Sequence, residues 1–90
     1  MDEFALIRRF FDRPIKDDSV LLSIGDDGAV IVPDPDRQLI CVVDTIVAGV
    51  HYPADLSPFD VGYRSVAINL SDMAAMGGRP RWMMLALSMP

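Results

Sequence analysis

Two stretches of this chain are apolar at consecutive positions, and they restrict its possible folds more than any other feature. One spans residues 38–43 and the other residues 81–90. A strand with one face in water alternates apolar and polar side chains, whereas a strand covered on both faces does not need to alternate. We therefore predict two strands here, each covered on both faces by other protein.

A chain of 90 residues cannot readily cover so much apolar surface alone. The uncovered strands indicate either a chain that pairs with a second copy through its strands or the front part of a longer protein, and we expect both together. Within these limits, residues 1–90 are predicted to form a single domain.

A further β-rich run, residues 28–33, precedes the strand at 38–43, and the turn formers Asp34-Pro35-Asp36-Arg37 lie between the two runs. Such a pattern predicts a hairpin. Residues 20–24 form a shorter apolar run that is plausible either as a strand or as an extended lead-in.

Two helices complete the predicted fold. The first covers residues 2–11, with Asp2 as a possible N-cap. The second begins with Ser57 as N-cap and Pro58 at the first helical position, and it runs to about Met76, before Gly77-Gly78. The fold class is therefore α+β, an antiparallel or mixed sheet with flanking helices.

Composition excludes several classes of function. A formal charge of −5 with only 8 basic residues argues against nucleic acid as a partner. An apolar run such as Leu39–Val43 is far too short to cross a membrane. An acidic start, Met1-Asp2-Glu3, is unlike a signal peptide, and a single cysteine excludes an internal disulfide, so we expect a cytoplasmic chain in which Cys41 is a buried, inert thiol.

The predicted hairpin brings carboxylates together. If its turn is centred between Pro35 and Asp36, Asp27 faces Asp44 across the pair of strands, about 5 Å apart at Cβ. Two ionised carboxylates at that distance repel each other unless a cation lies between them, and Asp26 adds a third. Oxygen ligands without nearby sulfur or a second histidine favour Mg²⁺ over Zn²⁺.

Asp72 belongs to a polar stripe on the second helix, which otherwise is apolar, and it could complete such a site. The alternative is structural: Asp26 and Asp27 form a turn, Asp44 caps a strand, and Asp72 lies at a helix end. That alternative explains Asp72 poorly, because a carboxylate near a helix C-terminus opposes the helix dipole. His51, the only histidine, has the same two interpretations, a structural residue or a contact to a ligand.

Three motifs occur in a familiar order: Ile24-Gly-Asp-Asp-Gly-Ala-Val30, Val43-Asp-Thr-Ile-Val-Ala-Gly-Val-His51, and Ala67-Ile-Asn-Leu-Ser-Asp-Met-Ala-Ala-Met-Gly77. In order and spacing they resemble the N-terminal half of the thiamine-monophosphate kinase family. The wider superfamily, which includes aminoimidazole ribonucleotide synthetase, selenophosphate synthetase and a hydrogenase maturation enzyme, shares the acidic motifs. The segment after Asp44-Thr45 is closer to the thiamine kinases.

The resemblance implies an ATP-dependent transfer of the γ-phosphoryl group to the phosphate of thiamine monophosphate, which gives thiamine diphosphate with no covalent intermediate and no catalytic side chain. It places Asp27, Asp44 and Asp72 on magnesium ligands, with Asp26 in the same motif, and His51 on a position that contacts the thiamine substrate. It also implies a homodimer in which strands of two subunits form a β-barrel, and an active site that uses both halves of each chain.

Two departures from the family pattern affect these expectations. Val42-Val43 stands where many members have Ser-Thr, so any metal contact there must use backbone carbonyls. The later glycine-aspartate motif and the C-terminal α/β domain lie outside these 90 residues. We therefore expect the chain to be inactive alone, with two alternatives: another ATP-using member of the superfamily, selenophosphate synthetase-like or hydrogenase maturation-like, or a non-catalytic dimerisation module.

Overall fold

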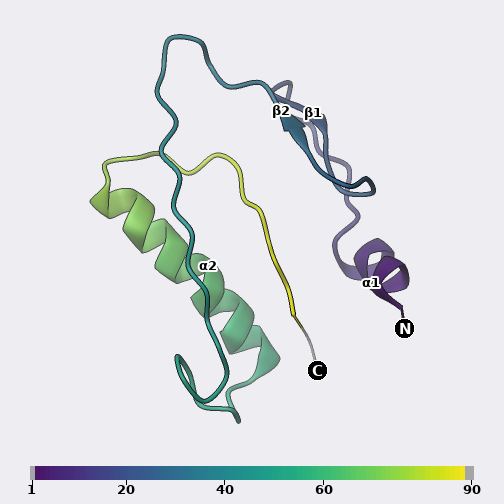
Figure 1. Ribbon diagram of the computed structural model, residues 1–90, viewed down its shortest axis with the longest axis vertical. Helices are drawn as coiled ribbons and strands as arrows, with labels where there is room; N and C mark the ends of the chain where they lie inside the picture. Colours follow the sequence, from purple (N-terminus) through teal and green to yellow (C-terminus); the bar gives the residue numbers. More distant parts are fainter. Residues whose placement is uncertain (1, 89–90) are drawn as a thin grey trace. The chain divides into compact units, whose positions relative to one another are not determined.

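The computed structural model describes residues 2–88, and it separates into two compact units that meet in sequence between Leu39 and Ile40. In chain order the elements are α1 (Glu3–Phe10), β1 (Val20–Leu22) and β2 (Val30–Ile31) in the first unit, and α2 (Pro58–Ala75) in the second (Figure 1).

Helix α1 begins where the sequence predicts. The Asp2 side chain accepts a hydrogen bond of 2.7 Å from the backbone N–H of Ala5, which confirms Asp2 as the N-cap. Glu3 in the first turn and Arg8 and Arg9 in the last turn complement the helix dipole. The helix ends at Phe10, well before Pro14.

The sheet of the first unit differs from the predicted hairpin. Strand β2 pairs with β1, antiparallel, with Val20 opposite Ile31 and Leu22 opposite Val30. Residues 34–37 do form a turn, closed by a hydrogen bond from the Arg37 N–H to the Asp34 carbonyl. Among residues 2–88, however, the structure has no strand at 38–43, so the predicted pairing of 28–33 with 38–43 is wrong here.

A second segment of turn formers explains this outcome. The segment 23–29 between β1 and β2 carries Gly25 at a φ of +110°, a backbone conformation that favours glycine. Its glycines and aspartates are turn formers as strong as those at 34–37. Sequence reasoning assigned the turn to the second of these two segments, whereas the β-ladder forms across the first.

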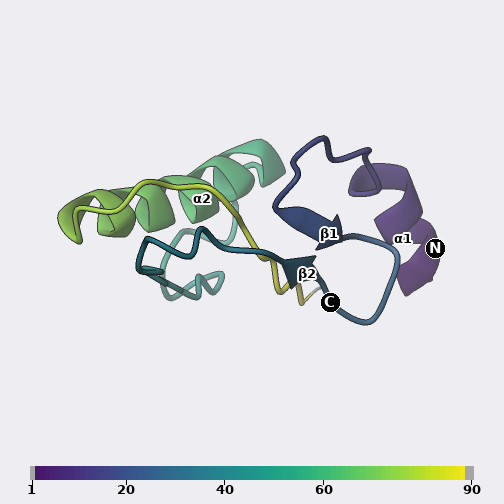
Figure 2. The same ribbon diagram turned by 90° about the horizontal axis from the view of Figure 1, so that it is seen from above.

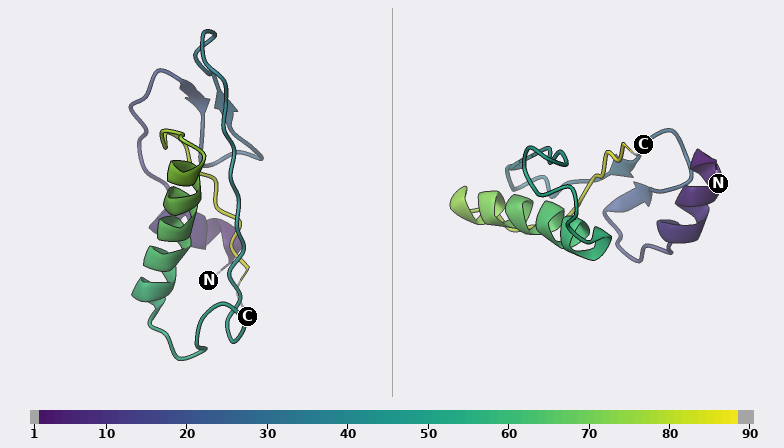
Figure 3. Two further views of the ribbon diagram at one scale, coloured as in Figure 1. Left: turned by 90° about the vertical axis from the view of Figure 1, so that its left-hand side faces the viewer. Right: turned by 90° about the horizontal axis from the view of Figure 1, so that it is seen from below.

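Helix α2 follows its predicted bounds closely. The Ser57 side chain accepts a hydrogen bond from the Asp60 N–H at 3.1 Å, with Pro58 at the start of the helix. At the other end, Gly77 adopts a φ of +72° and the Gly78 N–H donates to the Met73 carbonyl, a typical glycine-terminated helix end. The extended segments before and after α2 both run along the direction of the helix (Figures 1 and 3).

Residues 81–88 form no strand in the part of the chain that the structure describes, so this prediction is also wrong for these residues; Met89 and Pro90 lie outside the described residues. Both extended runs leave their side chains in water: Val43 is 90% exposed and Met84 is 89% exposed. Cys41, predicted to be buried, is exposed for the same reason.

Burial is low throughout the described residues. No hydrophobic side chain among them is fully buried, and Ser19 is the single buried residue, at 7% exposure. Its hydroxyl donates to the Asp17 carboxylate at 2.6 Å, which fixes the turn that leads into β1. Figure 2 shows that helix α2 in the second unit is accompanied by extended chain. No helix among the described residues is long and apolar enough to cross a membrane.

Candidate functional site

Asp26 and Asp27 lie side by side in the loop between β1 and β2. The Asp27 N–H donates to Asp26 Oδ1 at 2.7 Å, so one oxygen of Asp26 holds the loop in shape. Both residues are exposed. The Asp27 carboxylate has no hydrogen-bond or ion-pair partner among residues 2–88, which leaves both its oxygens available to a cation.

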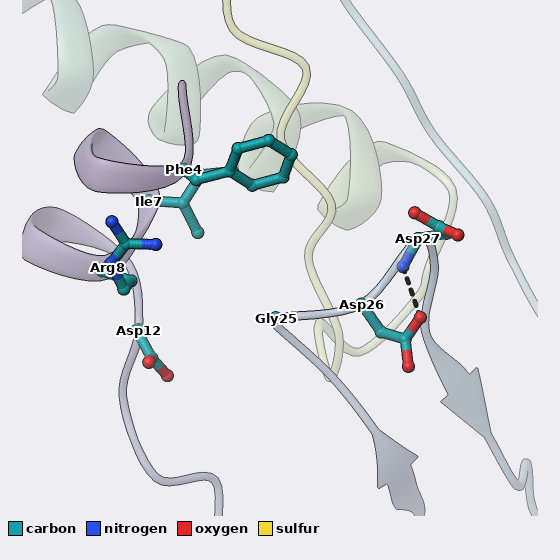
Figure 4. A pocket seen from close by; sticks show the side chains of 7 residues that line it. All are labelled: Phe4, Ile7, Arg8, Asp12, Gly25, Asp26 and Asp27. Carbon is teal, nitrogen blue, oxygen red and sulfur yellow. Dashed lines mark hydrogen bonds between the residues drawn. The ribbon is translucent and has the colours of Figure 1, made fainter. Parts of the chain in front are cut away.

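A hollow of about 410 Å³ lies between this loop and α1, within the first unit. Figure 4 shows Phe4 and Ile7 on the helix side and the acidic loop on the other side. The hollow thus combines an apolar wall with carboxylates and one guanidinium; its lining is Phe4, Ile7, Arg8, Asp12, Gly25, Asp26 and Asp27.

Sequence reasoning did not assign Arg8 or Asp12 to any site. The spacing of four residues from Phe4 to Arg8, and again from Arg8 to Asp12, could have indicated them. Side chains four residues apart lie near one another along one side of a helix, and Asp12 follows shortly after the end of α1. Phe4 and Ile7, which lie three residues apart on α1, line the same hollow.

Asp44 ends the first extended segment of the second unit. Its Oδ1 accepts a hydrogen bond of 2.8 Å from the Thr45 N–H. Asp26 makes the same bond to the residue that follows it, at 2.7 Å. In both cases the bond uses Oδ1 and restricts the carboxylate, while Oδ2 has no partner among the described residues. A carboxylate held in this way is a preorganised oxygen ligand.

Asp72 lies in the last turn of α2, where the helix has no basic residue. Two polar neighbours on its stripe bond to the helix backbone instead: Ser65 Oγ donates to the Gly62 carbonyl, and Asn69 Nδ2 to the Ser65 carbonyl. The Asp72 carboxylate has no partner among residues 2–88. The negative charge of Asp72 therefore interacts unfavourably with the helix dipole, and no described residue compensates for it. Such a position is easier to explain for a residue that binds a ligand than for a purely structural one.

His51 lies at the end of a tight loop after Asp44, where the chain turns at Gly49. The backbone N–H of Val47 donates to His51 Nδ1 at 2.8 Å. The ring is exposed, and Nε2 has no partner in the described part of the chain. One ring nitrogen is therefore used within the loop and the other is free for a ligand.

The structure brings Asp26 and Asp27 together in one loop of the first unit, and it places Asp44, His51 and Asp72 in the second. Among residues 2–88, no group of three His, Cys, Asp or Glu side chains is close enough to hold a metal ion. The structure does not form the hairpin register that set Asp27 opposite Asp44. The predicted pairing of these two carboxylates across a hairpin is therefore wrong for the described residues. The convergence of the four carboxylates stays a prediction.

The donor set nevertheless fits a hard cation. All four predicted ligands offer carboxylate oxygens, and each has at least one oxygen without a partner among the described residues. Mg²⁺ prefers oxygen ligands and is usually bound by one or two carboxylates together with water and phosphate. Such ligands suit a site in which phosphate completes the coordination.

Comparison with known proteins defines the class. Residues 25–90 match the family described as AIR synthase related protein, N-terminal domain, and this range contains all five predicted site residues. Because the match covers well over half of the chain, the chain belongs to this family.

Individual relatives within this family are similar to the chain over nearly its whole length. The chain is 50% identical over its whole length to the thiamine-monophosphate kinase of Haemophilus influenzae. It is 47% identical over 98% of its length to that of Escherichia coli, and 44% identical over its whole length to that of Bacillus subtilis. It spans 27–28% of the length of these relatives, and it matches their N-terminal part.

Proposed function

We propose that this chain is the N-terminal part of a thiamine-monophosphate kinase, which transfers the γ-phosphoryl group of ATP to the phosphate of thiamine monophosphate. The observation that carries the proposal is identity of 44–50% to three kinases of that name over 98–100% of the chain. Three acidic motifs in family order support it independently, since they lie on separate segments: the β1–β2 loop, the extended segment before His51, and the end of α2.

Asp27, Asp44 and Asp72, with Asp26, are the residues proposed to hold Mg²⁺. When bound, Mg²⁺ neutralises polyphosphate charge and holds donor and acceptor oxygens in line, which is most of what phosphoryl transfer requires. The chain's own contribution is to position these carboxylates. The bonds from Asp27 N–H to Asp26 and from Thr45 N–H to Asp44 fix two of them before any ligand arrives.

A general base is not part of this proposal. The attacking group is a phosphate oxygen, which is already anionic near neutral pH, so no side chain needs to remove a proton from it. This agrees with a set of predicted site residues that consists of four carboxylates and His51, which is assigned to substrate contact.

The uncovered apolar segments support a larger assembly. With Val43 and Met84 about nine-tenths exposed, residues 38–43 and 81–88 lack the cover that such sequences need. We propose that strands of a second subunit and the remainder of a longer chain supply it, that the working form is a cytoplasmic homodimer, and that residues 1–90 alone have no kinase activity.

The test is turnover by the full-length protein. With ATP and Mg²⁺, we expect thiamine diphosphate to form from thiamine monophosphate, and no comparable turnover with other acceptors such as selenide. Turnover of one of those acceptors in its place would favour another ATP-using member of the superfamily. A coding sequence that ended at Pro90 would favour the dimerisation module.

A further inference from the structure

The side-chain amide of Asn69 has a fixed orientation on the polar stripe of α2. Its Nδ2 donates to the Ser65 carbonyl, one helical turn earlier, at 2.8 Å, and the residue is half-buried. A backbone carbonyl can only accept a hydrogen bond, so the amide atom that faces it must be the nitrogen. The amide oxygen, Oδ1, is therefore the end turned away from the Ser65 carbonyl, and it has no partner among residues 2–88.

Asn69 lies on the same side of α2 as Asp72. Residues three apart are neighbours on a helix surface, about 5–6 Å apart at Cβ. Side chains on a helix lean toward its N-terminus, so the Asp72 side chain extends over the turn that carries Asn69. Asp72 is exposed, and no described residue pairs with its carboxylate. An amide oxygen and a carboxylate, both without donors among residues 2–88, are thus neighbours on this helix.

The hydrogen bond to Ser65 does not by itself explain an asparagine at this position. A serine hydroxyl makes the same kind of bond to a backbone carbonyl of the preceding turn, as Ser65 does to Gly62. Asparagine is also a poor residue for a helix interior, because its amide competes with the helical hydrogen bonds. What asparagine adds is an acceptor oxygen on a longer side chain, next to Asp72.

We infer that Asn69 is a positioning residue, whose Oδ1 accepts a hydrogen bond from a water ligand of the cation at Asp72; this rests on the proposed function. Mg²⁺ keeps several of its water ligands in proteins and is bound through only one or two carboxylates. Those waters are donors, and acceptors around them orient the coordination shell. A neutral amide oxygen accepts such a bond without adding negative charge near the end of α2, where negative charge is unfavourable.

Two substitutions separate the amide oxygen from the structural hydrogen bond. Asn69→Ser keeps a donor for the Ser65 carbonyl and removes the amide oxygen, whereas Asn69→Asp keeps an oxygen and removes the donor. Binding of Mg²⁺ to the full-length protein is measured by calorimetry with a non-hydrolysable ATP analogue. We expect the Kd for Mg²⁺ to rise about tenfold in Asn69→Ser, as is typical for loss of a group that orients metal ligands. Asn69→Asp should bind Mg²⁺ at least as tightly as the wild type, with a lower Tm because the bond to Ser65 is lost.

Ser65→Ala is the matched control, because it removes a hydroxyl of the same stripe that bonds to the Gly62 carbonyl, on the far side of Asn69 from Asp72. Its Kd for Mg²⁺ should equal that of the wild type. Wild-type affinity in Asn69→Ser would overturn the positioning role, and so would an equal loss in Asn69→Ser and Asn69→Asp. If Asn69→Asp does not fold, as its Tm will show, the affinity of Asn69→Ser decides.

Asp72→Asn, measured in the same way, distinguishes this inference from the proposed function. Weaker Mg²⁺ binding in Asp72→Asn together with wild-type binding in Asn69→Ser would overturn the role of Asn69 and leave the magnesium site in place. Unchanged binding in both variants would overturn the magnesium site at Asp72, and the role of Asn69 with it. Because this binding is measured without turnover, the expected result would support the role of Asn69 even in a protein that phosphorylates another acceptor.

Discussion

At the scale of single residues, the chain repeats one local device. Asp26 and Asp44, far apart in sequence, each accept the N–H of the following residue through Oδ1. The bond costs the carboxylate one lone pair and restricts its rotation, so less ordering remains when a cation binds. Asp27 and Asp72 make no such bond among the described residues and keep their oxygens free. Prearranged and unpaired carboxylates together are what a magnesium–phosphate site requires.

Replacing a free or prearranged carboxylate by its amide tests this assignment. In the full-length protein we expect Asp44→Asn and Asp72→Asn each to lower Mg²⁺-dependent turnover by about 100-fold or more, since a metal ligand contributes several kcal/mol to charge stabilisation. Asp36→Asn is the matched control, because Asp36 lies in the exposed turn at 34–37 and should leave turnover unchanged. Wild-type Mg²⁺ dependence in both site variants would refute the assigned roles.

Asp72→Asn carries a second expectation, about stability. Its carboxylate lies in the last turn of α2 without a basic neighbour in that turn, so removing the charge relieves an unfavourable interaction with the helix dipole. We expect the Tm of the full-length protein without ligands to stay the same or rise slightly as activity is lost. A clear fall in Tm would mean that Asp72 has a structural partner.

At the scale of elements, the sequence predicted helices well and strand pairing poorly, for a physical reason. Asp2, Ser57 and Gly77 act on backbone groups within a few residues, so helix ends can be found from local letters. A strand depends on a partner that is distant in the sequence. Two segments, 23–29 and 34–37, are both rich in turn formers, and either could connect two paired strands. The loop at 23–29 forms the connection within the sheet, which the choice of 34–37 missed.

The N-cap of α2 gives a direct test at this scale. Ser57→Ala removes the acceptor of the Asp60 N–H and the hydroxyl that donates to the Asp60 carboxylate at 2.8 Å. We expect a loss of about 1 kcal/mol in the free energy of unfolding of the full-length protein, measured by denaturant titration. Ser71→Ala, at an exposed position inside the same helix, should cost nothing measurable. Equal effects of the two substitutions would contradict the capping role.

At the scale of the whole molecule, the sequence predicted covered segments that residues 2–88 leave uncovered. Consecutive apolar residues at 38–43 and 81–88 predicted burial on both faces, and the described chain leaves them largely exposed, Cys41 included. The site residues that the acidic motifs indicate stay a prediction, and the geometric derivation of their convergence was wrong, because it depended on a strand pairing that the structure does not have.

Assembly is the expectation that belongs here. Sedimentation of the full-length protein should show a dimer, because exposed apolar segments such as 38–43 are usually covered in stable proteins. Val43→Lys, at a position 90% exposed in the isolated chain, should weaken the dimer if that face meets a second subunit. A well-behaved monomer at micromolar concentration would exclude pairing through strands.

The most direct measurement is Mg²⁺ binding by the full-length protein in the presence of a non-hydrolysable ATP analogue, followed by calorimetry in the wild type and in Asp27→Asn, Asp44→Asn and Asp72→Asn. We expect each substitution to weaken Mg²⁺ binding. Two substitutions combined should lower the free energy of Mg²⁺ binding by an amount that differs from the sum of the two single losses, because residues that share one site are not independent. Unchanged binding in all three variants would contradict a common magnesium–polyphosphate site.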